Sequence, residues 1–214
     1  MNQTADTIAV RRDPFGTATT GKLGMWLFII MDGLSFGGIL IGGAALRASA
    51  PSWPAPGEML NIPLTAFNTF LLICTSFTMV MALNSIQKGD QKGLVKFLAA
   101  TMLGGLLFLG IQVWEYAHFI GGSQELTASL EAAGFVGATS FLPSTSIFGA
   151  VFYATTCFHG LHVLSGVIYI SVILLQARKG TYSAENHDRV EILGLFWHFV
   201  DLIWIFVFTV IYLI

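Results

Sequence analysis

The sequence predicts an all-α, polytopic membrane protein whose chain crosses the bilayer five times. Of its 214 residues, 55% are hydrophobic and only 10% are charged, whereas about 25% are charged in an ordinary soluble domain. A β-barrel is excluded, because its strands would appear as segments of about ten residues with alternating polarity. The net charge of -2 leaves no basic surface for nucleic acid, so we expect no nucleic-acid partner.

Five apolar runs are each long enough to be a transmembrane helix, which needs about 20 mostly apolar residues to cross about 30 Å of hydrocarbon. All six prolines lie outside these runs or at the start of one, where a missing N–H does not break a helix. The expected spans, in order, are residues 22–46, 63–86, 94–119, 144–177 and 190–214.

The first 21 residues differ from the rest of the chain in being polar. They lack an apolar core followed by a small-residue cleavage site, so they do not fit a cleaved signal peptide. We therefore expect residues 1–21 to form a polar cytoplasmic tail and residues 22–214 to form a single five-helix transmembrane domain.

Basic residues predict the orientation of the spans, because positively charged short loops favour the cytoplasmic side. Among the ten Lys and Arg residues, only Arg47 lies in a connection on the side opposite the N-terminus. The N-terminus is thus expected to be cytoplasmic and the C-terminus periplasmic. The basic residues expected on the cytoplasmic side are Arg11, Arg12, Lys22, Lys88, Lys92, Lys96, Arg178, Lys179 and Arg189.

Two carboxyl groups are expected near the middle of the membrane. Asp32 lies ten residues after Lys22, and Asp201 lies ten residues after Glu191, which places each about 15 Å along its helix. An ionisable group at that depth is costly unless it is neutral, paired or hydrated, and so it suggests a function. The neighbours of Asp32 along the chain offer no cation, which favours a protonated or water-bonded carboxyl and a proton-linked role.

Histidines accompany these carboxyls. His198 precedes Asp201 by three residues and shares its helical face, so it is a candidate structural partner for Asp201 as an alternative to a proton-handling role. His159 and His162 form a second pair with the same spacing. Hydrogen bonding between helices is one interpretation of the histidines, and haem ligation is the other.

Glu115 is expected closer to the outer interface. It lies nineteen residues beyond Lys96, about 28 Å along the third span. The aromatic and histidine side chains around it are typical of interfacial anchors, namely Trp114, Tyr116 and His118.

Two cysteines, Cys74 and Cys157, lie apart in apolar runs without metal-ligand spacing, so we expect them to be packing residues and expect no metal site.

Several segments together resemble subunit III of the haem-copper respiratory oxidases. The main ones are FHGLHVLSGVIY at 158–169 and FWHFVDLIWIFVFTVIYL at 196–213. They occur in the family's order and cover nearly everything after the tail. Supporting segments are GKLGMWLFIIMDGLSFGG at 21–38, PSWPAPG at 51–57, NIPLTAFNTFLL at 61–72 and QVWEY at 112–116.

This resemblance implies a noncatalytic subunit, with no haem or copper of its own, in a bacterial inner membrane. Its partners would be catalytic subunit I, which reduces dioxygen and pumps protons, and subunit II. The family arranges its helices in a V whose cleft holds phospholipid, here expected as two spans against three in a five-helix form. Asp32 matches the carboxylate of the family's proton-linked position. The characteristic polar positions of the family correspond to Glu115, His159, His162, His198 and Asp201.

The electron donor is not settled by the resemblance alone. Trp53, Pro54 and the segment 61–72 favour a cytochrome c oxidase, whereas the last span is as similar to the quinol oxidases. Two other classes remain as alternatives. One is a free-standing membrane cytochrome with histidine-bound haem, and the other is a proton-coupled transporter, although no broken helix or inverted repeat supports the latter.

Overall fold

The structure is a computed structural model that describes residues 19–50 and 53–214, so most of the expected tail lies outside the described residues. Five helices are long and apolar enough to cross a membrane, and each coincides with one of the five apolar runs. The prediction of an all-helical, five-span protein is confirmed. These helices are α1 (Thr20–Ser49), α3 (Ile62–Gln87), α4 (Gln91–Gly121), α6 (Ile147–Arg178) and α7 (Asp188–Val207).

Three shorter elements accompany these helices, and the fifth candidate span, Asp188–Leu213, includes one of them. Helix α2 (Pro56–Met59) precedes α3, and the π-helix η1 (Phe208–Leu213) continues α7 to the end of the chain. Helix α5 (Gln124–Ala132) forms within the connection between α4 and α6, between the spans expected at 94–119 and 144–177. Leu126 and Leu130 are buried on one face of α5, and this amphipathic turn closes the end of the bundle.

Side-chain caps explain where several helices begin. The side chain of Asn61 accepts a hydrogen bond from the backbone N–H of Leu64 at the start of α3. Asp90 caps α4 in the same way, and Ser146 caps α6. Each cap satisfies a backbone donor that the first turn leaves without an intrahelical partner.

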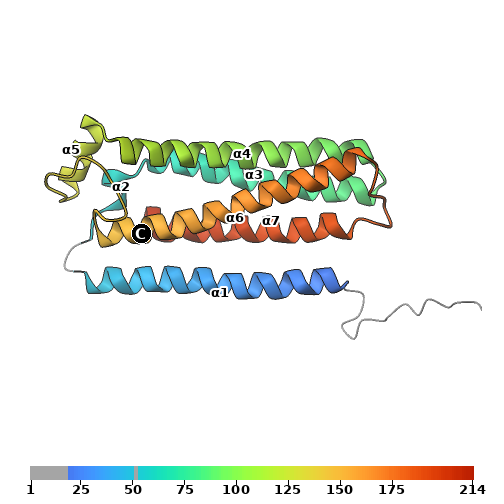
Figure 1. The fold of residues 1–214 in the computed structure, drawn as a ribbon, viewed down its shortest axis with the longest axis horizontal. Coiled ribbons are helices and arrows are strands. Elements are labelled where there is room, and N and C mark those ends of the chain that lie inside the picture. Colours follow the sequence, from blue (N-terminus) through green and yellow to red (C-terminus); the bar gives the residue numbers. More distant parts are fainter. Residues whose placement is uncertain (1–18, 51–52) are drawn as a thin grey trace, which may run out of the picture.

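The helices do not group as two spans against three. Helix α3 packs against α4 and α7, α4 packs against α6, and α1 packs against α6 and α7. Figure 1 shows α1 on one side of α6 and α7, with α3 and α4 on the other. The expected pairing of the first two spans is therefore not found, because α6 and α7 lie between them.

Two tryptophans of α7 form the centre of the bundle. Trp197 is fully buried, and its ring lies where α4 and α6 carry Gly105 and Gly166. The indole N–H of Trp197 donates to the hydroxyl of Thr75 at 3.0 Å. Glycine at both positions leaves room for the ring, so this one side chain of α7 fits against both α4 and α6.

Helix α1 contacts the rest of the molecule through a few buried residues along one face and through ion pairs at one end. Its buried residues are Asp32, Phe36 and Gly43, which lie on the face toward α6 and α7. At one end, Lys22 forms ion pairs with Asp188, at 3.1 Å, and with Glu191 of α7. The opposite face of α1 is largely exposed and apolar, as expected of a surface in contact with lipid or another membrane protein.

The two cysteines are not packing residues. Cys74 and Cys157 are both free and exposed, on the surfaces of α3 and α6. A thiol is a weak hydrogen-bonding group that behaves as a small apolar side chain, so both positions are compatible with a face turned toward lipid.

Candidate functional site

The structure brings Asp32 of α1 together with His162 of α6. The Nε2 atom of His162 lies 3.2 Å from Oδ2 of Asp32, and the two side chains are only 14% and 11% exposed. This is ion-pair distance, although Oδ2 completes no hydrogen bond in this arrangement. The pair is the one contact between a carboxylate and a basic group within the spans, away from their ends, in the described part of the chain.

Aromatic rings enclose this pair. Phe36 follows Asp32 by one helical turn, and its ring centre lies 5.1 Å from that of His162. The ring of Phe158, one turn before His162, lies 4.8 Å from the same imidazole and 4.7 Å from Phe36. The spacing of four residues on each helix therefore places one polar and one aromatic side chain on each side of the contact.

His162 is also bound within its own helix. Its Nδ1 atom lies 2.7 Å from the backbone carbonyl oxygen of Phe158. Because a carbonyl oxygen only accepts hydrogen bonds, Nδ1 must carry the hydrogen. That contact fixes the ring so that Nε2 faces Asp32.

The pairing of Asp32 with His162 was missed in the sequence, where Asp32 had no cation nearby. Depth along the helices contains the relevant signal. Asp32 lies seventeen residues before Ser49, and His162 lies fifteen residues after Ile147, or about 26 and 22 Å from the same end of the bundle. Which helix faces which remained unknown without the fold, so similar depths did not identify a pair.

His159 has different surroundings from His162 although both belong to α6. It is fully buried, and neither ring nitrogen has a hydrogen-bond partner. Its ring lies over Trp204 with a centre separation of 4.7 Å and meets the edge of Phe108 at 5.7 Å. His159 therefore acts as part of the aromatic core.

His198 and Asp201 are not paired with each other. The Nδ1 atom of His198 and the hydroxyl of Ser76 on α3 are 2.5 Å apart. Asp201 is 5% exposed, and neither of its carboxylate oxygens has a hydrogen-bond partner. The expectation of a structural contact between the two is wrong, because the ring of His198 turns toward α3.

Glu115 is more deeply enclosed than its distance along the helix suggested. It is 6% exposed, and its Oε2 atom accepts hydrogen bonds from Gln112 at 3.1 Å and from the hydroxyl of Tyr212 at 3.4 Å. The neighbouring Trp114 is 58% exposed and stacks on His118, as expected of interfacial anchors. Tyr116 instead turns inward and donates to Thr156.

An apolar cavity of about 300 Å³ lies between the end of α1, the start of α6 and the C-terminal end of the chain. Its lining is almost entirely hydrophobic, and Arg47 is its one charged residue. The guanidinium of Arg47 lies 5.9 Å from the ring centre of Trp53. Apolar walls beside a single cation are suited to a hydrocarbon chain that carries an anionic group.

The described residues contain no group of three or more His, Cys, Asp or Glu side chains that could hold a metal ion. The three histidines considered as haem ligands have separate partners. His198 contacts Ser76, His159 packs against Trp204, and His162 faces Asp32.

Comparison with known proteins places the sequence in a family. A family model described as cytochrome c oxidase subunit III matches residues 15–214. Cytochrome c oxidase subunit 3 of Thermostichus vulcanus is 33% identical over 90% of this chain and 86% of its own length. Cytochrome bo(3) ubiquinol oxidase subunit 3 of Pseudomonas putida is 31% identical over 90% and 84%. Quinol oxidase subunit 3 of Bacillus subtilis is 30% identical over 92% and 88%. The chain belongs to the cytochrome c oxidase subunit III family.

Proposed function

We propose that this chain is the noncatalytic subunit III of a proton-pumping cytochrome c oxidase in the inner membrane of a bacterium. It packs beside catalytic subunit I, with subunit II in the same complex, and supports proton uptake and the lifetime of the active enzyme. Haem and copper are held by the partner subunits. The family match over residues 15–214 supports the assignment to the complex, and the contact between Asp32 and His162 supports the proton-linked role.

The protons of this contact can be counted from its geometry. Because Nδ1 of His162 donates to the carbonyl of Phe158, one further proton decides the state of the pair. It resides either on Asp32, which leaves two neutral groups, or on Nε2, which makes an imidazolium beside a carboxylate. Both arrangements have zero net charge, so the proton can move between the two groups without changing the charge of the pair, which is suited to passing protons toward a neighbouring subunit.

The test is the replacement Asp32→Asn in the intact oxidase. Asn carries no exchangeable acid, so turnover should fall most at high pH, where protons are scarce, and the active enzyme should lose activity sooner. Asp32→Glu serves as the control, because it keeps a carboxyl and should retain most of the wild-type behaviour. Turnover and inactivation lifetime in Asp32→Asn equal to wild type across pH would refute the proton-linked role.

We also place a phospholipid on this chain. The proposed position is the cavity beside Arg47, with the acyl chain along its apolar walls and the phosphate near the guanidinium. Replacing Arg47 by Gln should reduce the phospholipid that co-purifies with the complex and shorten its active lifetime. Unchanged lipid content in Arg47→Gln would contradict this position.

A quinol oxidase of the same superfamily is the second candidate. The relatives from Pseudomonas putida and Bacillus subtilis, both named as quinol oxidase subunits, match this chain about as well as the cytochrome c oxidase subunits. The partner that corresponds to subunit II decides between them. A dinuclear copper motif in that partner indicates cytochrome c as the electron donor.

A free-standing haem-binding cytochrome has no support from the side-chain contacts. His198 contacts Ser76, His159 packs against Trp204, and His162 faces Asp32. A reduced-minus-oxidised absorption spectrum of the isolated chain is the direct check, since a b-type haem would give bands that a noncatalytic subunit lacks.

A further inference from the structure

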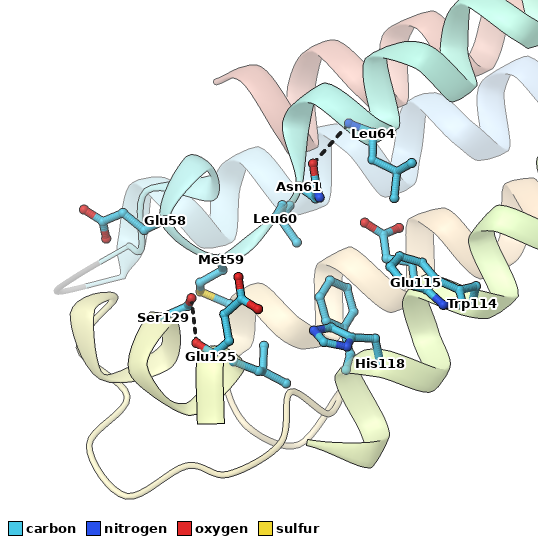
Figure 2. Close-up of a pocket in the computed structure, with 12 residues that line it drawn as sticks. Glu58, Met59, Leu60, Asn61, Leu64, Trp114, Glu115, His118, Glu125 and Ser129 are labelled. Atoms are coloured by element: carbon cyan, nitrogen blue, oxygen red, sulfur yellow. Dashed lines mark hydrogen bonds between the residues drawn. The ribbon is translucent and has the colours of Figure 1, made fainter. Parts of the chain in front are cut away.

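A pocket of about 420 Å³ lies at the end of the bundle that carries α2 and α5. Its walls come from four elements, namely α2, the start of α3, the end of α4 and α5. Figure 2 shows Glu115 of α4 and Glu125 of α5 reaching toward the space between these elements. This pocket shares no lining residue with the cavity at Arg47 and does not include Asp32 or His162.

The charge of this pocket is one-sided. Its lining includes Glu58, Glu115 and Glu125, with His118 as the one basic residue and neither Lys nor Arg. Figure 2 shows the carboxylates of Glu115 and Glu125 toward the space and that of Glu58 away from it. None of the three forms an ion pair with a basic residue in the described part of the chain. Arg47 is directed to Trp53 instead.

Glu115 provides the independent sign of a missing partner. The side chain is 94% buried if its 6% exposure is subtracted from the whole. Its Oε2 atom has two donors, but Oε1 is buried without any hydrogen-bond partner. A buried oxygen without a donor is costly, and this one belongs to a residue of the pocket wall.

We propose that this pocket receives a lysine or arginine side chain from another subunit of the oxidase. The apolar part of the lining suits the aliphatic stem of such a residue, and the cationic head would lie beside the carboxyl groups of Glu115 and Glu125. These apolar residues are Met59, Leu60, Leu64, Phe119 and Leu126.

Two other occupants fit the pocket less well. A phospholipid would bring its phosphate against the carboxylates of Glu115 and Glu125, with no Lys or Arg in the lining to balance them. A metal ion would need several ligands held close together, and no such group exists among the described residues. A basic side chain carries positive charge and hydrogen-bond donors, so it complements both the negative charge of the pocket and the carboxyl group of Glu115, whose Oε1 has no partner.

A structure of the intact oxidase tests the occupant directly. We expect a Lys or Arg nitrogen of a second subunit within hydrogen-bond distance of the Glu115 carboxylate. A lipid headgroup, a metal ion or water alone in the pocket would overturn the proposal. The result is independent of whether the electron donor is cytochrome c or quinol, and of the role of Asp32.

Subunit retention provides a functional test in the same complex. Glu115→Gln keeps the size of the side chain and removes its charge, so this chain should dissociate from the oxidase about tenfold faster, since truncating one partner of a buried charge pair acts mainly on dissociation. The dissociation rate of Glu115→Asp should fall between those of wild type and Glu115→Gln. The matched control is Glu131→Gln, an exposed residue of α5 outside this pocket, which should behave as wild type.

Helical content and melting temperature separate an interface effect from misfolding. If both are unchanged in the Glu115→Gln complex, faster dissociation reflects the interface. Dissociation that rises with salt in wild type but is fast and insensitive to salt in Glu115→Gln would support an ionic contact. Equal dissociation of wild type and Glu115→Gln at every salt concentration would refute it, as would equal loss in the Glu131→Gln control.

Discussion

Trp204 connects four helices through its ring and its single polar atom. Its indole N–H donates to the hydroxyl of Thr69 on α3 at 2.9 Å, and its ring lies edge-to-face with Phe108 of α4 and over His159 of α6. Thr69 in turn donates to the backbone oxygen of Thr65. The hydroxyl thus donates one hydrogen bond and accepts another, so its hydrogen and one of its two lone pairs are used.

A double-mutant cycle should show how much this bond contributes. Trp204→Phe keeps a ring but leaves the Thr69 oxygen without its donor, so the free energy of unfolding should fall by about 1–3 kcal/mol. Thr69→Val in the same background removes the hydroxyl whose oxygen has lost its donor and should recover part of that loss. Unfolding in mixed detergent micelles measures both. If the changes in unfolding free energy of the two single variants simply add in the double variant, the two side chains are not directly coupled.

Single residues also show what the sequence left open. The depth of Asp32 was predicted, but its partner lies 130 residues away on another helix, and neither run of sequence indicates which faces meet. Glu115 was placed near an interface because distance along a helix is easy to count. Its burial depends instead on the rotation of α4, which directs Glu115 to Tyr212 and the adjacent Trp114 outward.

At the scale of elements, α6 packs through positions that lack a side chain. A Cβ atom added at Gly166 would lie 2.8 Å from the ring of Trp197, whereas one added at Gly160 would meet nothing within 4 Å. The two glycines belong to the same helix but face different surroundings. Packing therefore explains Gly166 and does not explain Gly160.

Replacing each of these glycines by alanine gives opposite expectations. Gly166→Ala should lower the free energy of unfolding by about 1–3 kcal/mol, because a rigid buried ring must move. Gly160→Ala should have no such cost and should gain up to about 1 kcal/mol from the better helix propensity of alanine. Thermal unfolding of the purified complex compares them. A destabilised Gly160→Ala or an unaffected Gly166→Ala would show that the packing around Trp197 is described wrongly.

The five long elements were predictable, whereas the short ones were not. Runs such as 94–119 are continuous in hydrophobicity, and a bilayer of fixed thickness demands their length. Helix α5 has only two buried leucines, Leu126 and Leu130, within a polar connection. Its formation depends on the pocket wall it covers, and that tertiary contact has no periodic pattern of its own.

At the scale of the whole molecule, α1 is the least integrated span. Of its strongest hydrophobic window only 17% is buried, against 56% for the last span. Its exposed residues form a large apolar surface. Among the long helices in the described part of the chain, it packs on α6 and α7. Because α1 does not pack on α3, the expected grouping of two spans against three is wrong.

Ion pairs at the end of α1 should help to keep it in place. Replacing Lys22 by Met removes its contacts to Asp188 and Glu191, and the partial exposure of these groups limits the loss to below about 1 kcal/mol. Hydrogen exchange in α1 should become faster near residue 22, most clearly at low salt. Lys92→Met, an exposed substitution on α4, is the control. Equal exchange in the two variants would show that the ion pairs do not hold α1.

The position of α1 has a consequence for biosynthesis. The helix is completed at Ser49, but its contacts on α7 begin only at Asp188. At roughly 5–20 residues per second the ribosome needs about 7–28 s to make the intervening chain. During that interval the first helix has none of its α7 partners, and Asp32 must enter the bilayer before His162 has been synthesised. The first span to be inserted is thus among the last to dock.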